Sequence, residues 1–160
     1  MDIKLKWIDE EEELFKQVLE LRWKVLREPL GMKRGTEHNV KDNKPYSFHI
    51  VAIVDEKVVG TCSLVHKEGS QEIRLFQMGV YDEWQGKGVG KKIVLHIIDT
   101  LKNDQRIKTA HKLLEKRLSK LKCHARAYAC PFYEKLGFHK VGEMFVEVSI
   151  DHFKMEISLN

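Results

Sequence analysis

The chain has 160 residues, 42% of them apolar and 32% charged, with a formal net charge of +4. This length and composition predict one globular domain, residues 1–160, and the mild charge does not by itself require nucleic acid or an acidic membrane as a partner. Because no apolar run approaches membrane-spanning length and the acidic start is neither a signal nor a transit peptide, we expect a cytoplasmic protein with no membrane partner.

A short strand over residues 4–8 is followed by a helix. The helix begins in the acidic run of residues 9–13, since carboxylates favour a helix N-terminus, and ends at Pro29 and Gly31. Residues 31–46 are polar, with two glycines and a proline, and predict a loop. Its place before the sheet makes this loop a candidate substrate-facing segment, and a plain surface loop is the alternative.

Three antiparallel strands come next. Residues 47–54 and 57–65 predict a hairpin whose turn is Asp55 and Glu56. A third strand, over residues 72–81, is apolar enough to be largely buried at the centre of the sheet.

A glycine-rich turn directly follows the central strand. It contains Gly86, Gly88 and Gly90, and an amphipathic helix ending near Leu101 comes after it. Glycine lets the backbone approach a ligand closely, and a helix N-terminus with lysines beside it attracts anions. We therefore expect a phosphate site, although glycines that serve packing alone are the alternative. The spacing matches neither the P-loop nor the dinucleotide fingerprint.

The segment after this helix is basic. Residues 102–120 are rich in lysine and arginine, and their propensity predicts an extra helix over residues 106–119. We expect a solvated helix, because no aromatic residues interleave with the charges and no nucleic-acid motif occurs. Closure over a cofactor and a homodimer contact stay open as roles.

The last quarter predicts a strand, a short helix and a strand pair. A strand at residues 120–124 leads into the segment AYACPFYEKLGF, where Pro131 suits the first turn of a helix and Gly137 its end. Residues 139–148 and 150–159 predict the final two strands. The alternation of strands and helices predicts an α/β sandwich.

Two motifs resemble those of the GNAT family of N-acetyltransferases, in its small bacterial type. They are Gln85-x-x-Gly88-x-Gly90 after a strand and the AxxFYxxxGF pattern of the segment AYACPFYEKLGF. The resemblance covers residues 14–159. It implies a mixed, mostly antiparallel sheet flanked by helices, with a V-shaped split at the central strands. It also implies transfer of an acetyl group from acetyl-CoA to a primary amine, by direct attack in a ternary complex.

The resemblance also implies which residues bind acetyl-CoA. The backbone of Met78, Gly79 and Val80 would pair with the pantetheine arm as an added strand does, and an N–H near Met78 would stabilise the oxyanion. The pyrophosphate would lie on the glycine turn, against Gln85, Gly86, Lys87, Gly88, Val89, Gly90 and Lys91. Many relatives carry asparagine where this chain has Arg126, which suggests a phosphate or backbone contact instead.

Tyr133 resembles the family tyrosine that donates a proton to the departing thiolate, and packing of its ring on the sheet is the alternative. The general base has no motif. An ammonium substrate must lose a proton before attack, through a carboxylate, a histidine or a water chain. Four candidates lie on the substrate side, and each has an ordinary structural or surface explanation as well: Glu72, Glu147, His152 and His49.

Other functions and partners stay open. A non-catalytic CoA-binding or sensor module would use the same fold, and a nucleic-acid-binding protein would use the basic helix. The acceptor is expected to be a small-molecule or peptide amine that no motif identifies. We expect no metal, because Cys62, Cys123 and Cys130 contain no CxxC pair, which also argues against a disulfide framework.

Overall fold

The computed structural model describes residues 2–160, and within them it contains nine strands and three α-helices. The strands are β1 (Lys4–Ile8), β2 (Ser47–Val54), β3 (Lys57–His66), β4 (Glu72–Val80), β5 (Arg106–Lys108), β6 (Leu113–Glu115), β7 (Lys120–Arg126), β8 (His139–Glu147) and β9 (Ile150–Ser158). The helices are α1 (Glu13–Arg22), α2 (Val89–Asp99) and α3 (Cys130–Lys135), with shorter helical turns η1 (Trp23–Arg27), η2 (Glu28–Leu30), η3 (Asp82–Trp84), η4 (Thr100–Asp104) and η5 (Ala127–Ala129). None of the helices described is long and apolar enough to cross a bilayer.

Seven of the strands form one sheet in the order β1-β2-β3-β4-β7-β9-β8. All neighbours in it are antiparallel except β4 and β7, which are parallel. The hairpin between β2 and β3 turns at Asp55 and Glu56, which both have positive φ angles, 49° and 67°. The mixed, mostly antiparallel sheet is therefore confirmed, as is the hairpin.

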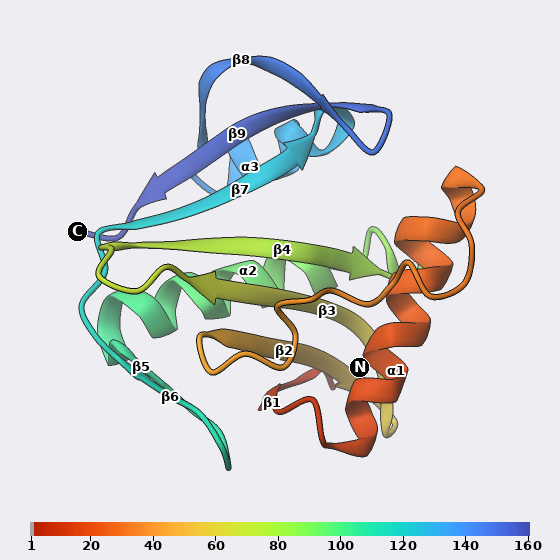
Figure 1. Cartoon of the computed structure of the whole chain (residues 1–160), viewed down its shortest axis with the longest axis horizontal. Coiled ribbons are helices and arrows are strands. Elements are labelled where there is room, and N and C mark those ends of the chain that lie inside the picture. Colours follow the sequence, from red (N-terminus) through yellow and green to blue (C-terminus); the bar gives the residue numbers. More distant parts are fainter. Residues whose placement is uncertain (1) are drawn as a thin grey trace.

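Helices cover both faces of the sheet (Figure 1). On one face, α1 buries Val18 and Leu21 against Val51 and Val58. On the other face, α2 and α3 bury a larger cluster that includes Ile93 and the inner residues of β2, β3 and β4. The apolar positions of α2 recur every three or four residues, which gives this helix the single buried side that the sequence predicted.

The prediction of a helix over residues 106–119 is wrong. This segment forms the hairpin of β5 and β6, in which Ile107 lies opposite Leu114. Both side chains are buried, whereas their neighbours along each strand are exposed. Because burial alternates with a period of two, the segment fits a strand pair on the sheet better than a helix with one apolar side.

Candidate functional site

The two central strands separate partway along their length. β4 and β7 pair over four residues only, and Leu75 opposite Cys123 is the last pair. Beyond it, β4 continues to Val80 beside β3, and β7 continues to Arg126 beside β9. Figure 1 shows the strands meeting at one end and diverging toward the end of α1. This confirms the V-shaped split, and a cavity of about 1000 Å³ opens in it.

A β-bulge lies in β4 where the split begins. The register between β3 and β4 shifts between Thr61 and Ser63, so that β4 carries one extra residue. Gln77 there has a positive φ of 54°, a region that is costly for a residue with a side chain. Its side-chain oxygen accepts a hydrogen bond of 3.3 Å from Arg27 Nη2. The bulge lies within the part of β4, residues 74–80, that lines the cavity.

The glycine turn closes one end of the cavity. Gly86 and Gly88 have φ angles of 75° and 82°, which confirms the need for glycine at both positions. The helix α2 starts directly afterwards, and its first internal hydrogen bond runs from the Lys92 N–H to the Gly88 carbonyl at 3.0 Å. The preceding amides, of Val89 to Lys91, have no partner inside the helix and suit an anion.

Close packing holds the glycine turn against the cavity wall. A Cβ atom on Gly90 would lie 3.2 Å from Met78 and 3.3 Å from Phe132, so only glycine leaves the wall undisturbed. The side-chain amide of Gln85 donates to the Val80 carbonyl at 3.1 Å, which links the turn to the end of β4. Lys87 is not among the lining residues; its Nζ lies 5.2 Å from the centre of the Trp84 ring.

Tyr133, on α3, faces the same cavity. Its side chain is packed edge-on against Phe132 and Phe138, with ring centres 5.0 and 5.3 Å away. Only 5% of the residue is exposed, and burial raises the pKa of the Tyr133 phenol well above its ordinary value. The phenol therefore keeps its proton at neutral pH and is able to donate it.

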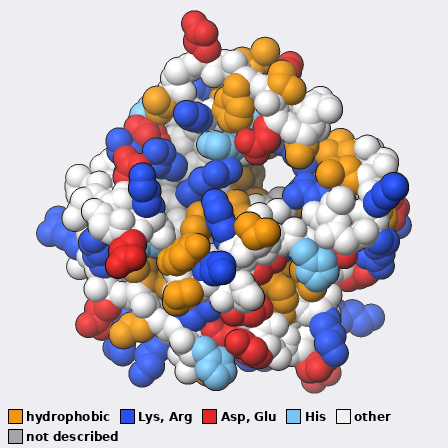
Figure 2. Space-filling model, viewed as in Figure 1, with side chains coloured by type: hydrophobic (Ala, Val, Ile, Leu, Met, Phe, Trp, Pro, Cys, Tyr) orange, Lys and Arg blue, Asp and Glu red, His pale blue; other side chains and the backbone are white. Residues whose placement is uncertain are grey.

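The wall opposite the glycine turn, which we call the α1 side, comes from five parts of the chain. They are the turns η1 and η2 after α1, the loop before β2, the strand β4, the strand β7 and the β8–β9 hairpin. Figure 2 shows lysine and arginine side chains on both sides of the hollow in this face of the molecule. The charged and histidine residues of the α1 side are Arg27, Lys41, Arg74, His124, Arg126, Glu147 and His152.

Two of the four predicted base candidates lie on the α1 side. Glu147 Oε2 lies 3.1 Å from His124 Nδ1, at the end of β8. His152 Nδ1 lies 2.7 Å from the Ile150 carbonyl. A carbonyl only accepts, so His152 carries its proton on Nδ1 and its lone pair on Nε2.

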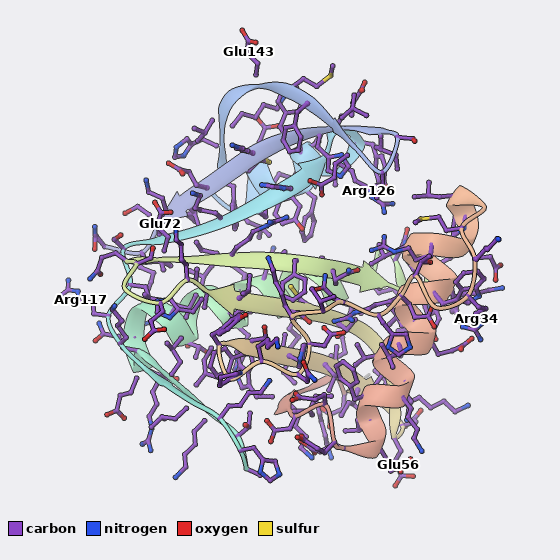
Figure 3. All side chains as sticks on the ribbon, in the orientation of Figure 1. Arg34, Glu56, Glu72, Arg117, Arg126 and Glu143 are labelled. Atoms are coloured by element: carbon purple, nitrogen blue, oxygen red, sulfur yellow. The ribbon has the colours of Figure 1, made fainter. Side chains whose placement is uncertain are left out.

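The other two base candidates lie elsewhere. Glu72 is at the closed end of the split, where its Oε2 accepts a bond of 2.9 Å from Lys122 that lowers the pKa of the carboxyl. Figure 3 shows Glu72 and Arg126 at opposite ends of the split. His49 is fully buried in β2 between Ser63 and the Asp42 carbonyl, and neither Glu72 nor His49 lines the cavity.

His124 is a site residue that the sequence reading missed. Its Nδ1 lies 2.9 Å from Arg74 Nη2 as well as beside Glu147. Burial, and then the charge of Arg74, lower the pKa of His124, which favours the neutral ring. The strand from Lys120 to Arg126 alternates buried and partly exposed residues, and this period of two was the signal that places His124 on the cavity face.

One group of possible metal ligands, Asp9, Glu11 and His111, lies outside the cavity. Asp9 is fully buried. Its carboxylate accepts bonds from the Thr109 hydroxyl at 2.6 Å and the His111 N–H at 3.2 Å. These bonds account for the burial of Asp9 without an ion.

Comparison with known proteins places this geometry in a family. The family model described as "Acetyltransferase (GNAT) domain" matches residues 32–159. The 5-NmdU N-acetyltransferase of Pseudomonas phage PaMx11 is 33% identical over 93 residues, which are 58% of this chain and 58% of that protein. The chain thus aligns with little more than half the length of this relative.

Solved structures show the same fold along the whole chain. Escherichia coli ElaA superposes with a TM-score of 0.77 at 18% identity, covering 97% of this chain and 99% of that one. An aminoglycoside 6'-N-acetyltransferase complexed with coenzyme A superposes with a TM-score of 0.73 at 13% identity, covering 100% and 98%. The split sheet, the glycine turn and the matched family model together show that the chain belongs to the GNAT acetyltransferase family.

Proposed function

We propose that the protein is an acetyl-CoA-dependent N-acetyltransferase that acts on a primary amine by direct attack in a ternary complex. One observation carries the proposal: the unpaired edge of β4 runs into the glycine turn, and Tyr133 faces the same cavity. Acetyl-CoA supplies the acetyl group as a thioester. The phage relative is named an N-acetyltransferase and one structural neighbour is a coenzyme A complex, which supports this choice.

The chain's own residues fit a coenzyme A molecule. The backbone of Met78 to Val80 would pair with the pantetheine arm, because β4 is paired only with β3 there and its edge toward β7 is free. The amides of Gly86 to Lys91 would hold the pyrophosphate at the start of α2. An N–H near Met78 would stabilise the charge that develops on the thioester oxygen. Lys87 would act only from the outer side of the turn, beside Trp84.

Tyr133 would give its phenolic proton to the sulfur as the new C–N bond forms and the C–S bond breaks. Its raised pKa makes it a weak acid toward a thiolate whose thiol titrates near pH 8.5. Transfer therefore depends on close positioning and on a concerted step rather than on acidity. The fixed packing of the ring between Phe132 and Phe138 supplies that positioning.

The proton of the attacking ammonium would leave toward the α1 side. Glu147 and the Nε2 atom of His152 are the acceptors that we propose, because both residues line the cavity. Glu72 and His49 have no place in this scheme, since they lie outside the cavity.

The predictions of cellular location and of assembly depend on the sequence alone. A cytoplasmic location and a possible homodimer stay predictions. The nucleic-acid alternative relied on a basic helix over residues 106–119, and the structure has the β5–β6 hairpin there instead.

Turnover by Tyr133→Phe tests the catalytic proposal. We expect release of free coenzyme A in the presence of small primary amines to fall about 10²- to 10⁴-fold, while the Kd for acetyl-CoA stays within about twofold. Tyr46→Phe, outside the cavity, is the control and should match the parent protein. Unchanged turnover in Tyr133→Phe would exclude its role as the acid. Tight binding with no turnover by the parent protein would favour the sensor alternative.

A further inference from the structure

Three partly buried arginines of the α1 side have no carboxylate partner. They are Arg27, Arg74 and Arg126, which come from η1, β4 and β7. Across residues 2–160, no salt bridge or hydrogen bond to a carboxylate involves any of them. By contrast, fully buried Arg22 pairs with Asp42. A guanidinium that has lost water is normally paired.

The partners that these arginines do have are neutral. Arg27 donates to the Thr36 carbonyl at 3.1 Å and to the Gln77 side chain at 3.3 Å. Arg126 donates to the Leu26 carbonyl at 3.3 Å and to the Tyr128 hydroxyl at 3.2 Å. These bonds hold the guanidinium groups in place without forming an ion pair.

Among the three arginines, Arg74 has a buried hydrogen-bond donor without a partner. Its Nη2 lies 2.9 Å from His124 Nδ1, which is an uncharged acceptor. Its Nε atom is buried and has no hydrogen-bond partner. A buried donor without a partner costs free energy, and no acceptor within residues 2–160 removes that cost.

The charges of the α1 side are unbalanced. Four of its lining residues, Arg27, Lys41, Arg74 and Arg126, are cationic, and Glu147 alone is anionic. Burial lowers the pKa of Arg27, and the nearby charge of Arg126 lowers it further. A bound anion would relieve this repulsion, and a planar guanidinium binds carboxylate and phosphate through paired hydrogen bonds.

The cofactor's pyrophosphate does not account for Arg74. Arg74 lies six residues before Val80, the last residue of β4, which corresponds to about 20 Å along an extended strand. The glycine turn comes only after Val80 and has its own amides and Lys91 for phosphate.

We infer that the acceptor is a small primary amine that also carries a carboxylate or phosphate group. This inference rests on the proposed acetyltransferase function. The anionic group binds between Arg74 and Arg27, with Arg126 at the open end of the split, and the ammonium binds toward Glu147. A polyamine or an uncharged amine would leave the three guanidinium groups unpaired.

Matched pairs of acceptors test the inference. The pairs are phosphoethanolamine with ethanolamine, and 4-aminobutyrate with its amide, so that each pair differs in the anionic group alone. We expect kcat/KM to favour the anionic member about 10- to 100-fold, and each anionic member to bind the coenzyme A complex more tightly in calorimetry. The two pairs separate a phosphate preference from a carboxylate preference, and a preference within either pair supports the inference.

Variants assign the preference to the arginines. Arg74→Gln and Arg27→Gln should each reduce the anionic preference about tenfold and leave the Kd for acetyl-CoA within about twofold. Arg117→Gln is the control, since Arg117 is exposed at the far end of the molecule (Figure 3). Unchanged acetyl-CoA binding also shows that each variant is folded.

Each contrary result has a distinct meaning. Equal binding and equal turnover within both pairs, or a preference for the neutral members, would overturn the inference and leave the acetyltransferase proposal standing. A preference that survives in Arg74→Gln and in Arg27→Gln would overturn the assignment to these arginines. Failure of the parent protein to bind acetyl-CoA would instead remove the proposed function itself.

Discussion

Leu75 of β4 and Cys123 of β7 are the last paired residues of two parallel strands, and the cavity opens where their pairing ends. The bulge at Gln77 follows two residues later, where β4 has only β3 beside it. The split and the bulge therefore form one feature. It leaves the backbone edge of β4 free beside the cavity, which residues 74–80 line.

Gln77 tests the energetic cost of this bulge. Gln77→Val should lower the free energy of unfolding by about 1–3 kcal/mol relative to Gln77→Gly, because a β-branched residue is strained at a positive φ and glycine is not. Both variants lose the bond to Arg27, so the difference isolates the backbone. Urea unfolding measures it. Equal stability of the two variants would show that the backbone there is unstrained.

The regular parts of the fold were predictable from the sequence because their signals are local. The alternation in residues 47–65 predicted the β2–β3 hairpin, and Pro131 and Gly137 marked the ends of α3. Gly86 and Gly88 indicated a turn with positive φ angles. The motifs around them also predicted the cavity and the place of Tyr133.

The β5–β6 hairpin was not predictable in this way. Its lysines, leucines and glutamates have high helix propensity, but long-range contacts override it. Lys112 is only 8% exposed and donates to Glu10 at 2.9 Å and to the Ser47 carbonyl at 2.7 Å. Gln105 ends the preceding helix with a φ of 55°, although neither glycine nor proline marks that position. Only the tertiary structure explains both features.

Several of the residues that form the α1 side of the site could not be predicted from the sequence either. Arg27, Arg74 and His124 come from three segments that are separated by about 50 residues each in the sequence. No short motif links them, and the sheet order brings them together. Glu72 and His49 were candidates because of residue type alone, and their places in the sheet keep them out of the cavity.

The buried ion pair between Arg22 and Asp42 should be essential for stability. Arg22 is fully buried, and its two terminal nitrogens bond the Asp42 carboxylate at 2.7 and 3.0 Å. Asp42→Asn keeps the shape and removes the counter-charge, so we expect a loss of about 3–5 kcal/mol in the free energy of unfolding. Glu20→Gln breaks the exposed pair with Arg34 and should cost far less, because solvent screens that pair. Similar losses in both variants, measured in urea, would contradict this assignment.

His49 should make stability depend on pH. Burial lowers its pKa from the ordinary 6.5 to about 4, so between these values the unfolded chain binds more protons than the folded one. Its contribution is therefore present above pH 6.5 and is lost as the pH falls toward 4, to a total of about 3 kcal/mol. The neutral ring suits its partners, since Nε2 lies 2.9 Å from the Asp42 carbonyl and must carry the proton.

Urea unfolding at several pH values between 7.5 and 4.5 checks this linkage. His49→Gln should flatten the loss of stability over that range. The control His139→Gln should not, because the His139 side chain is 65% exposed. A slope that is the same in His49→Gln as in the parent protein would place the titrating groups elsewhere.

Calorimetric titration with acetyl-CoA tests the central claim most directly, using the parent protein, Gly88→Glu and Gly69→Glu. Gly88 and Gly69 are both exposed and have φ angles of 82° and 78°, with open space beside each, so the two variants carry the same backbone strain and the same added charge. Gly69 lies in the turn before β4, away from the cavity. We predict micromolar binding by the parent protein and Gly69→Glu, and its loss in Gly88→Glu. No binding by the parent protein, or equal binding by both variants, would contradict a cofactor site on the glycine turn.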